Sequence, residues 1–317
     1  MIVAVLRGGA SAEHAVSLKA GAHILTHLAR EPYQVIDVFI DRAGVWHVRG
    51  VPMTPERALS TADVAFNTLL GGIGDESVVK TLNRIGIPYT GSAPYASSLA
   101  QSKPFTKKIL ERAGVLMPRH TLLSVSADLE NEASEAFRKY SPPIIVKPSA
   151  SGSSVGLTLA KKFKEFWDGV KKAFSFGTSV MVEEFIPGRE ASAGIVEGLR
   201  ESPYYQMIPT EIGVPTWDVY DYDAKFSGSA NIQAPGNFSR EESLELERLA
   251  KVVHEELGLR HYSQSDFVVS PHGIYFLEAN PLPSLSPDGA FQKSLDSVGV
   301  STDELIDHLI GLAAKKR

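Results

Sequence analysis

The sequence predicts a multidomain protein in which a small parallel α/β domain is followed by mixed α+β structure. The chain of 317 residues is long enough for two or three domains. Strand-like and helix-like segments alternate over residues 1–95, which is typical of a parallel sheet covered by helices. Beyond residue 95 this regular alternation stops. We therefore expect an N-terminal α/β domain at 1–95, a central domain at 96–187 and a C-terminal domain at 188–317.

The first domain opens with a continuous apolar run over residues 2–6, of the kind found in buried parallel strands. Gly8 and Gly9 break the run, and Ser11 can cap a following helix with apolar positions as far as Leu25. The further elements expected in this domain are strands at 33–40, 63–66 and 87–89 and a helix at 77–85.

The central domain should begin with a Lys-rich helix over residues 103–113 that ends at Gly114. Its other expected elements are strands at 120–124, 144–147, 156–160 and 179–185 and a helix at 163–173. In the C-terminal domain we expect mainly strands, a mobile loop at 215–240, helices at 240–257 and 302–314, and a β-hairpin within 262–281.

Composition points to a soluble globular protein, with 43% hydrophobic and 22% charged residues. A net charge of −5 offers no basic surface for nucleic acid, and the absence of cysteine excludes disulfides and thiolate chemistry. The apolar start is short and lacks a basic leader, and no segment reaches the roughly 20 apolar residues that span a membrane. We expect a cytoplasmic enzyme, with a soluble binding protein as the alternative.

The hairpin carries the most informative pattern. Apolar runs flank Ser-Pro-His-Gly, and a loop at Pro271-His272-Gly273 would place Asp266 opposite Glu278. Asn280 would project from the same face as Glu278. Opposed carboxylates repel unless a cation lies between them, and an all-oxygen set favours Mg²⁺, which often shares its ligands with nucleotide phosphates. The alternative is a solvated hairpin end that carries two unrelated acids.

Two further segments suit phosphate binding. The Gly/Ser-rich loop at 149–156 follows Lys147 and lies between two predicted strands, so its backbone N–H groups could cover phosphates as a lid. Lys103 stands in the first turn of its helix, where the helix dipole disfavours a cation unless an anion is near. The simpler interpretations are an ordinary Gly/Ser turn and a solvated lysine.

Two acidic segments allow two interpretations each, a ligand-binding role or an ordinary structural one. Glu183 and Glu184 lie on a strand that could receive ribose hydroxyls and pair its backbone with adenine, or they could sit on an exposed face. Glu13 follows Gly8-Gly9 where the first strand meets the first helix, near the carboxyl end of the sheet, where ligands bind. It could receive a substrate ammonium group or merely complement the helix dipole.

Taken together in order and spacing, these segments resemble the D-alanine–D-alanine ligases of the ATP-grasp superfamily over nearly the whole chain. The implied fold is an N-terminal α/β domain followed by a two-part ATP-grasp fold. The matching motifs are Gly8 to Ser17, Ser102-Lys103 with Thr106-Lys107, Val146 to Gly156, Val182 to Glu190, Tyr220 to Phe226, and Asp266 with Glu278-Ala279-Asn280.

The resemblance implies ATP between the central and C-terminal domains. Its phosphates would meet Lys103, Lys147 and Lys225 beneath a lid that includes Ser151 and Ser154. The adenosine would be held by Glu183, Glu184, Phe185, Ile186 and Glu190. Two Mg²⁺ ions, for which Mn²⁺ is an alternative, would bind Asp266, Glu278 and Asn280.

The implied reaction joins two D-alanines for peptidoglycan synthesis. The first carboxylate attacks the γ-phosphate to give an acyl phosphate, and the second amine then displaces phosphate. Glu13 would orient the first ammonium group with help from Ser153, and a substrate loop would contain Tyr222 and Phe226. The resemblance also implies a homodimer, and no nucleic acid or membrane partner is expected.

The chain departs from the family pattern mainly on the amino-acid side. Gln264 replaces an arginine that would stabilise the tetrahedral intermediate, and Ser284 replaces a glycine whose N–H would serve the oxyanion. The other departures are Leu70-Gly71 for His-Gly, Gly74 to Ser77 for Gly-Glu-Asp-Gly, Phe226 for tyrosine, and Gly289 for a substrate-binding serine. Three interpretations follow: a working D-alanine–D-alanine ligase, a ligase with another acceptor such as D-lactate or another amino acid, and an ATP-binding homologue without ligase activity.

Overall fold

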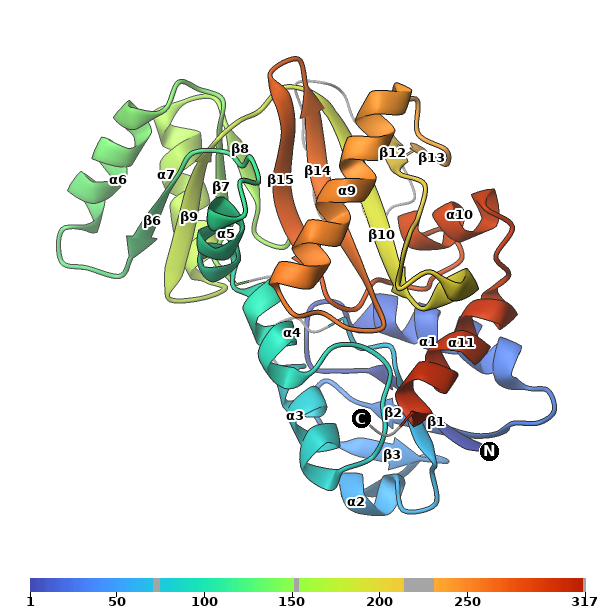
Figure 1. Cartoon of the computed structure of the whole chain (residues 1–317). Helices are drawn as coiled ribbons and strands as arrows, with labels where there is room; N and C mark the ends of the chain where they lie inside the picture. The colour runs from blue at the N-terminus through green and yellow to red at the C-terminus, as the bar shows by residue number, and fades with distance from the viewer. Residues whose placement is uncertain (71–74, 151–153, 214–230, 316–317) are drawn as a thin grey trace.

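The computed structural model describes residues 1–70, 75–150, 154–213 and 231–315. Within these ranges the chain forms three β-sheets with helices packed on them (Figure 1). The mixed α/β architecture predicted from the sequence is confirmed.

The first sheet has the order β4-β3-β2-β1-β5. Its centre is parallel as predicted, because β1 pairs in parallel with both β2 and β5, while β3 and β4 add an antiparallel edge. Residues near Tyr89 form only one bridge, to Ala65, rather than the predicted strand. The elements are β1 (Ile2–Gly8), α1 (His14–Leu28), β2 (Gln34–Ile40), β3 (Trp46–Val48), β4 (Val51–Met53), α2 (Pro55–Ala58), β5 (Val64–Asn67) and α3 (Glu76–Ile85).

The second sheet is antiparallel throughout, with the order β6-β9-β7-β8. Helix α7 packs on one face, where Phe166 and Val170 join Val146 and Val180 in a buried cluster. The elements from this part of the chain are α4 (Pro94–Gln101), α5 (Lys103–Arg112), β6 (His120–Ser124), α6 (Leu129–Lys139), β7 (Ile144–Pro148), β8 (Thr158–Ala160), α7 (Phe163–Phe174) and β9 (Ser179–Glu184).

The third sheet has the order β13-β12-β10-β14-β15, with β11 paired to β10. β13 falls within 215–240, so the part of the predicted loop that the structure describes includes a strand. The elements are β10 (Arg189–Glu197), a 3-10 helix (Leu199–Glu201), β11 (Tyr204–Gln206), β12 (Thr210–Gly213), β13 (Asn231–Gln233), α9 (Arg240–Glu256), β14 (Tyr262–Ser270), β15 (Gly273–Asn280), α10 (Ala290–Ser297) and α11 (Thr302–Ala314).

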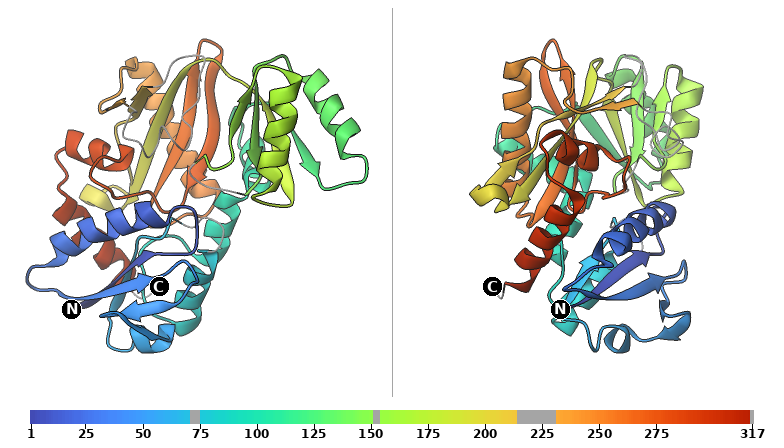
Figure 2. Two further views of the ribbon diagram at one scale, coloured as in Figure 1. Left: turned by 180° about the vertical axis from the view of Figure 1, so that it is seen from behind. Right: turned by 90° about the vertical axis from the view of Figure 1, so that its right-hand side faces the viewer.

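The end of the described chain returns to its beginning. Helix α11 lies beside α1 (Figure 2), and Leu305 and Leu309 share one buried cluster with Val3, Ile24 and Phe66. The first sheet and the C-terminal helices are therefore packed as one body. Among the described residues, no helix is both long and apolar enough to span a membrane.

Candidate functional site

The hairpin β14–β15 places Asp266 directly opposite Glu278, as predicted, although by a different route. Ser270 pairs with Gly273, so the connection has two residues rather than the three expected. The register then shifts between Asp266 and Phe267, where β15 contributes one extra residue, and this bulge restores the pairing. Two acids on neighbouring strands therefore project from one face.

Neutral donors surround the Asp266 carboxylate. Ser192 Oγ on β10 donates to Oδ1 at 2.7 Å, and Gln264 Nε2 donates to the same atom at 3.1 Å. Asn280 Nδ2 lies 3.3 Å from Oδ2. Gln264 pairs with Asn280 across the two strands, so these residues share the face with Asp266 and Glu278.

The residues present fit a hard divalent cation. Asp266, Glu278 and the amide oxygen of Asn280 form an all-oxygen set, which is what Mg²⁺ prefers. Within the described ranges no three His, Cys, Asp or Glu side chains cluster as metal ligands. With only two carboxylates available, a bound ion would have to complete its shell with water or phosphate oxygens, as Mg²⁺ commonly does.

Three lysines are buried next to this hairpin. Lys103 begins α5 as predicted, and its Nζ lies 3.4 Å from Glu278 Oε2. The Glu183 carboxylate on β9 forms ion pairs with Lys107 Nζ at 2.8 Å and with Lys147 Nζ at 2.7 Å. Three ammonium groups therefore face three carboxylates, those of Glu183, Glu278 and Asp266, and a bound divalent cation would give the site the positive charge that suits a polyphosphate.

Burial and pairing shift the pKa values of this cluster. Burial acts to raise the pKa of Glu183, but the lysines Lys107 and Lys147 outweigh it and lower the pKa to about 2. Burial also lowers the pKa of Lys103 and of Lys107, and the partners Glu278 and Glu183 offset part of that effect. Glu183 therefore stays ionised over the whole physiological range.

The Gly/Ser-rich segment connects two paired strands, as predicted, because β7 and β8 are antiparallel neighbours. Ser149 at its start is buried, and its carbonyl accepts the Lys103 N–H at 3.1 Å, which fixes the first turn of α5 against the end of β7. Ser154 and Gly156 at its far end have φ of 57° and 77°. Ser151 and Ser153 lie outside the described residues, as do Tyr222, Lys225 and Phe226 of the predicted substrate loop.

The predicted adenine-binding segment spans the end of β9, because Glu183 and Glu184 are the last two residues of the strand and Phe185 and Ile186 follow it. The Glu184 carboxylate accepts hydrogen bonds from the Arg119 backbone N–H at 2.8 Å and from its Nε at 2.7 Å. Cations therefore hold both glutamates, and the next two residues, Phe185 and Ile186, are half-buried. Glu190 lies at the start of β10, opposite Val268.

Glu13 lies at the start of α1 in a loop that a buried aspartate organises. Its side chain is buried, and its N–H donates to Ser11 Oγ at 3.2 Å. Asp75 accepts from Ala10 N–H at 2.9 Å and Ser11 Oγ at 2.7 Å, while burial raises the pKa of Asp75. Gly9 has a φ of 101°, and a Cβ there would lie 2.5 Å from Asp75 Oδ1. The sequence shows no local signal for this role of Asp75.

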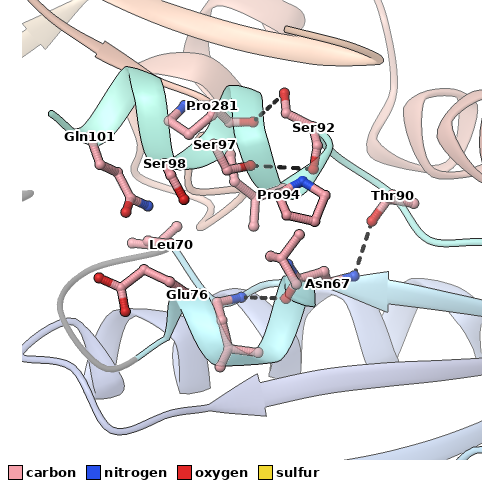
Figure 3. A pocket seen from close by; sticks show the side chains of 13 residues that line it. Asn67, Leu70, Glu76, Thr90, Ser92, Pro94, Ser97, Ser98, Gln101 and Pro281 are labelled. Carbon is pink, nitrogen blue, oxygen red and sulfur yellow. Dashed lines mark hydrogen bonds between the residues drawn. The ribbon is translucent and has the colours of Figure 1, made fainter. Parts of the chain in front are cut away.

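The remaining site candidate, Ser284, lies in the loop after β15. Its Oγ donates to Ser286 Oγ at 3.1 Å and accepts the Ser286 N–H at 3.3 Å. Nearby, a small pocket lies between the end of β5, helix α4 and the residues after β15, with Asn67, Ser92 and Pro281 in its lining (Figure 3). Leu70 also lines the pocket.

Comparisons with known proteins agree along the whole chain. Residues 109–311 match the family model described as D-ala D-ala ligase C-terminus, and residues 2–57 match D-ala D-ala ligase N-terminus. The chain is 33% identical to a D-alanine–D-alanine ligase of Geotalea uraniireducens, covering 99% of this chain and 96% of the relative. It is 30% identical to a ligase of the same name from Halalkalibacterium halodurans over the full length of both.

Solved structures show the same fold at lower identity. D-alanyl-alanine synthetase A of Vibrio cholerae superposes with a TM-score of 0.84 and 23% identity, covering 100% of this chain and 99% of that one. The VanG D-Ala:D-Ser ligase of Enterococcus faecalis gives a TM-score of 0.83 and 23% identity, with coverages of 98% and 99%.

Proposed function

This chain belongs to the D-alanine–D-alanine ligase family, and from that premise we propose that it joins two D-alanines through an acyl-phosphate intermediate. It is accordingly an ATP-dependent ligase of the ATP-grasp fold. The observation that supports this most directly is the opposed pair Asp266 and Glu278 beside the buried Lys103 and Lys147. That combination would suit a metal ion beside a triphosphate.

The described residues suggest how the chain would bind the phosphates of ATP and the first D-alanine. Lys103 and Lys147 would bind the phosphates, where fixed positive charge stabilises the charge that develops during transfer. Mg²⁺ held by Asp266, Glu278 and Asn280 would supply further charge neutralisation at the phosphates. Glu13, buried at the start of α1, would hold the ammonium group of the first D-alanine so that its carboxylate faces the γ-phosphate.

The finer features follow from the same premise. We propose the division at 1–95, 96–187 and 188–317, adenine binding along 183–186, Mg²⁺ as the metal, a homodimer and a cytoplasmic location. Lys225, Ser151 and Ser154 would complete the phosphate contacts, Ser153 would assist Glu13, and Ser284 and the loop with Tyr222 and Phe226 would lie at the amino-acid site.

One observation keeps a second function in view. The Gln264 amide donates to Asp266 Oδ1 at 3.1 Å, so it is engaged with the proposed metal ligand rather than directed at a substrate. A neutral amide is also a weaker partner for a developing oxyanion than the arginine expected there. Because the same oxyanion would form with any acceptor, the loss of this cation does not select D-lactate, and the alternative that it favours is an ATP-binding homologue without ligase activity. If Gln264→Arg raises D-alanine-dependent turnover, the D-alanine function gains support.

A phosphate-release screen tests the proposal. We expect the purified protein to release phosphate from ATP with D-alanine, and not with L-amino acids or with D-lactate. Lys147→Ala should abolish this release, whereas the matched change Lys172→Ala, at an exposed lysine of α7, should leave it unchanged. Nucleotide binding without release in the presence of any amino or hydroxy acid would reject the ligase function.

A further inference from the structure

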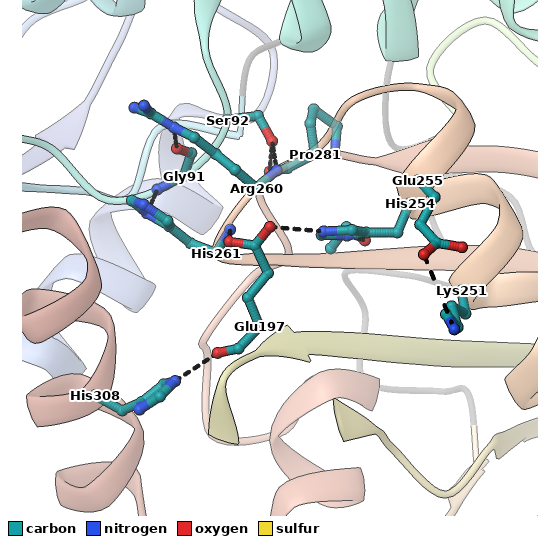
Figure 4. A network of polar contacts seen from close by, with 11 residues as sticks. Gly91, Ser92, Glu197, Lys251, His254, Glu255, Arg260, His261, Pro281 and His308 are labelled. Atoms are coloured by element: carbon teal, nitrogen blue, oxygen red, sulfur yellow. Dashed lines mark hydrogen bonds and ion pairs between the residues drawn. The ribbon is translucent and has the colours of Figure 1, made fainter. Parts of the chain in front are cut away.

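A polar network joins the first sheet to the start of the hairpin β14–β15, which carries the proposed metal ligands and is called the metal hairpin below (Figure 4). The reaction proposed above gives this network no role. Gly91 and Ser92 leave the first sheet just after the bridge at Tyr89. They meet Arg260 and His261, which directly precede β14. We call these four residues the interdomain clamp.

Each side of the clamp offers a backbone group to the other. The Gly91 N–H donates to His261 Nδ1 at 3.1 Å, and Arg260 Nε donates to the Gly91 carbonyl at 2.7 Å. The Arg260 backbone N–H donates to Ser92 Oγ at 3.1 Å. The Arg260 guanidinium also stacks over the Tyr89 ring, 4.7 Å from its centroid. Because a backbone N–H can only donate, His261 Nδ1 must act as an acceptor, and the ring proton is on Nε2.

His261 adopts a strained backbone that its neighbours hold in place. Its φ of 66° lies in the left-handed region, which non-glycine residues rarely occupy. The Glu197 carboxylate accepts the His261 N–H at 2.7 Å, and the Glu197 N–H donates to the His261 carbonyl at 2.8 Å. Fully buried His254 lies 3.5 Å from the other Glu197 oxygen. Such strain persists where surrounding contacts fix it, and it gathers at functional sites.

The clamp is continuous with both strands that carry the proposed metal ligands. His261 directly precedes β14 and lies five residues before Asp266 on that strand. Ser92 Oγ reaches the carbonyl of Pro281 at 3.5 Å, and Pro281 directly follows Asn280. A displacement of Gly91 and Ser92 would therefore move the first sheet relative to the face that bears Asp266 and Glu278.

We propose that Arg260 and His261 are positioning residues that fix the first sheet, and with it Glu13, against the metal hairpin. The proposal rests on the proposed function, because a carboxylate held by one domain must meet a phosphate held by the others. A misplacement of about 1 Å can cost about a hundredfold in rate.

Two substitutions of His261 separate positioning from folding. His261→Gly removes the acceptor and relieves the positive φ, so the fold should be retained. His261→Asn also tolerates this φ, and its Oδ1 can accept the Gly91 N–H in place of Nδ1. We expect kcat with D-alanine to fall about tenfold or more in His261→Gly, with KM for ATP within about twofold, and to recover in His261→Asn. Arg49→Gly, at another positive φ in the β3–β4 turn, is the matched control and should have no effect.

A distance measurement tests the clamp without relying on ligase activity. Because the chain has no cysteine, Asn83→Cys on α3 and Glu256→Cys on α9 provide two unique sites for spin labels. Pulsed electron paramagnetic resonance should give a narrow distance distribution in the parent and in His261→Asn, and a broader one in His261→Gly. An unchanged distribution in His261→Gly would overturn the proposal. A parent protein that shows no amino-acid-dependent turnover would contradict the proposed function, and the distance result would still decide the clamp.

Discussion

The carboxylate of Glu183 lies between Lys107 and Lys147, at 2.8 and 2.7 Å, and all three side chains are buried. Glu183 pairs with Ile145 across β9 and β7, so its side chain projects from the same face as that of Lys147. Lys107 reaches the same carboxylate from α5. We infer that Glu183 keeps both ammonium groups in place before a nucleotide arrives.

Glu183→Gln should lower the free energy of unfolding and make it depend less on pH in the acid range. The pKa of Glu183 falls from 4.5 to about 2 in the folded protein, so its ion pairs stabilise the fold above pH 4.5. That stabilisation is lost as pH falls from 4.5 toward 2. Urea unfolding across this window should show a shallower pH dependence in Glu183→Gln and a loss of about 3 to 5 kcal/mol at neutral pH.

The neighbouring Glu184→Gln is the control for this prediction. Glu184 pairs with the exposed side chain of Arg119, and such a pair contributes at most about 1 kcal/mol. Equal losses in the two variants would contradict the special role of Glu183.

A second prediction at this scale concerns the metal. Glu278→Gln removes one of two carboxylates on the hairpin face, and it should raise the Mg²⁺ concentration for half-maximal turnover at least about tenfold. Titration of phosphate release with Mg²⁺ at saturating ATP measures this shift. Glu256→Gln, at an exposed position of α9, should titrate like the parent, and an unaltered titration in Glu278→Gln would remove Glu278 from the metal site.

At the scale of elements, the hairpin shows what local patterning can and cannot predict. The apolar runs and the Ser-Pro-His-Gly segment were sufficient to place Asp266 opposite Glu278. They could not predict the two-residue turn and the bulge that compensates for it. A three-residue turn without a bulge would place Asp266 opposite Glu278 equally well. Helices with strong periodicity were also predicted closely, and α11 begins and ends as expected.

Other features depend on contacts between distant segments and carry no local signal. Asp75 binds the loop at Ala10 and Ser11, and His261 binds Gly91. These partners lie so far apart in the sequence that no helix or strand periodicity could relate them. The helices α4, α6 and α10 were also missed. α4 and α10 are short, whereas α6 does carry a local signal, with acids in its first turn and Arg138 and Lys139 in its last. For Glu183, the strand was predicted but the buried lysine partners were not.

Helix α9 offers a stability prediction at this scale. Ser239 and Glu242 form a capping box, in which Ser239 Oγ accepts the Glu242 N–H at 3.1 Å. Ser239→Ala should lower the free energy of unfolding by about 1 kcal/mol, and Ser239→Asp should restore it. Chemical denaturation measures both variants. If Ser239→Asp lost as much free energy of unfolding as Ser239→Ala, the cap would not be the cause.

At the scale of the whole molecule, the shared core predicts cooperative unfolding. Leu309 on α11 is fully buried in the cluster that also holds Val3, Ile24 and Phe66. Leu309→Ala should cost about 2 to 5 kcal/mol and move a single calorimetric transition to lower temperature. Leu244→Ala, at a side chain that is 55% exposed on α9, should change stability by less than about 0.5 kcal/mol. Two separated transitions in the parent would show that the first sheet does not depend on α11.

The packing of α11 against β5 and α1 also bears on how the chain folds as it leaves the ribosome. β1 is translated long before α11, so the nascent first sheet must wait, with an apolar flank uncovered, until the segments between them have been made. Exposed apolar surface of this kind attracts chaperones and promotes aggregation. We expect ribosome-bound chains that stop before residue 302 to remain protease-sensitive in their earliest segment, and chains that include α11 to become resistant.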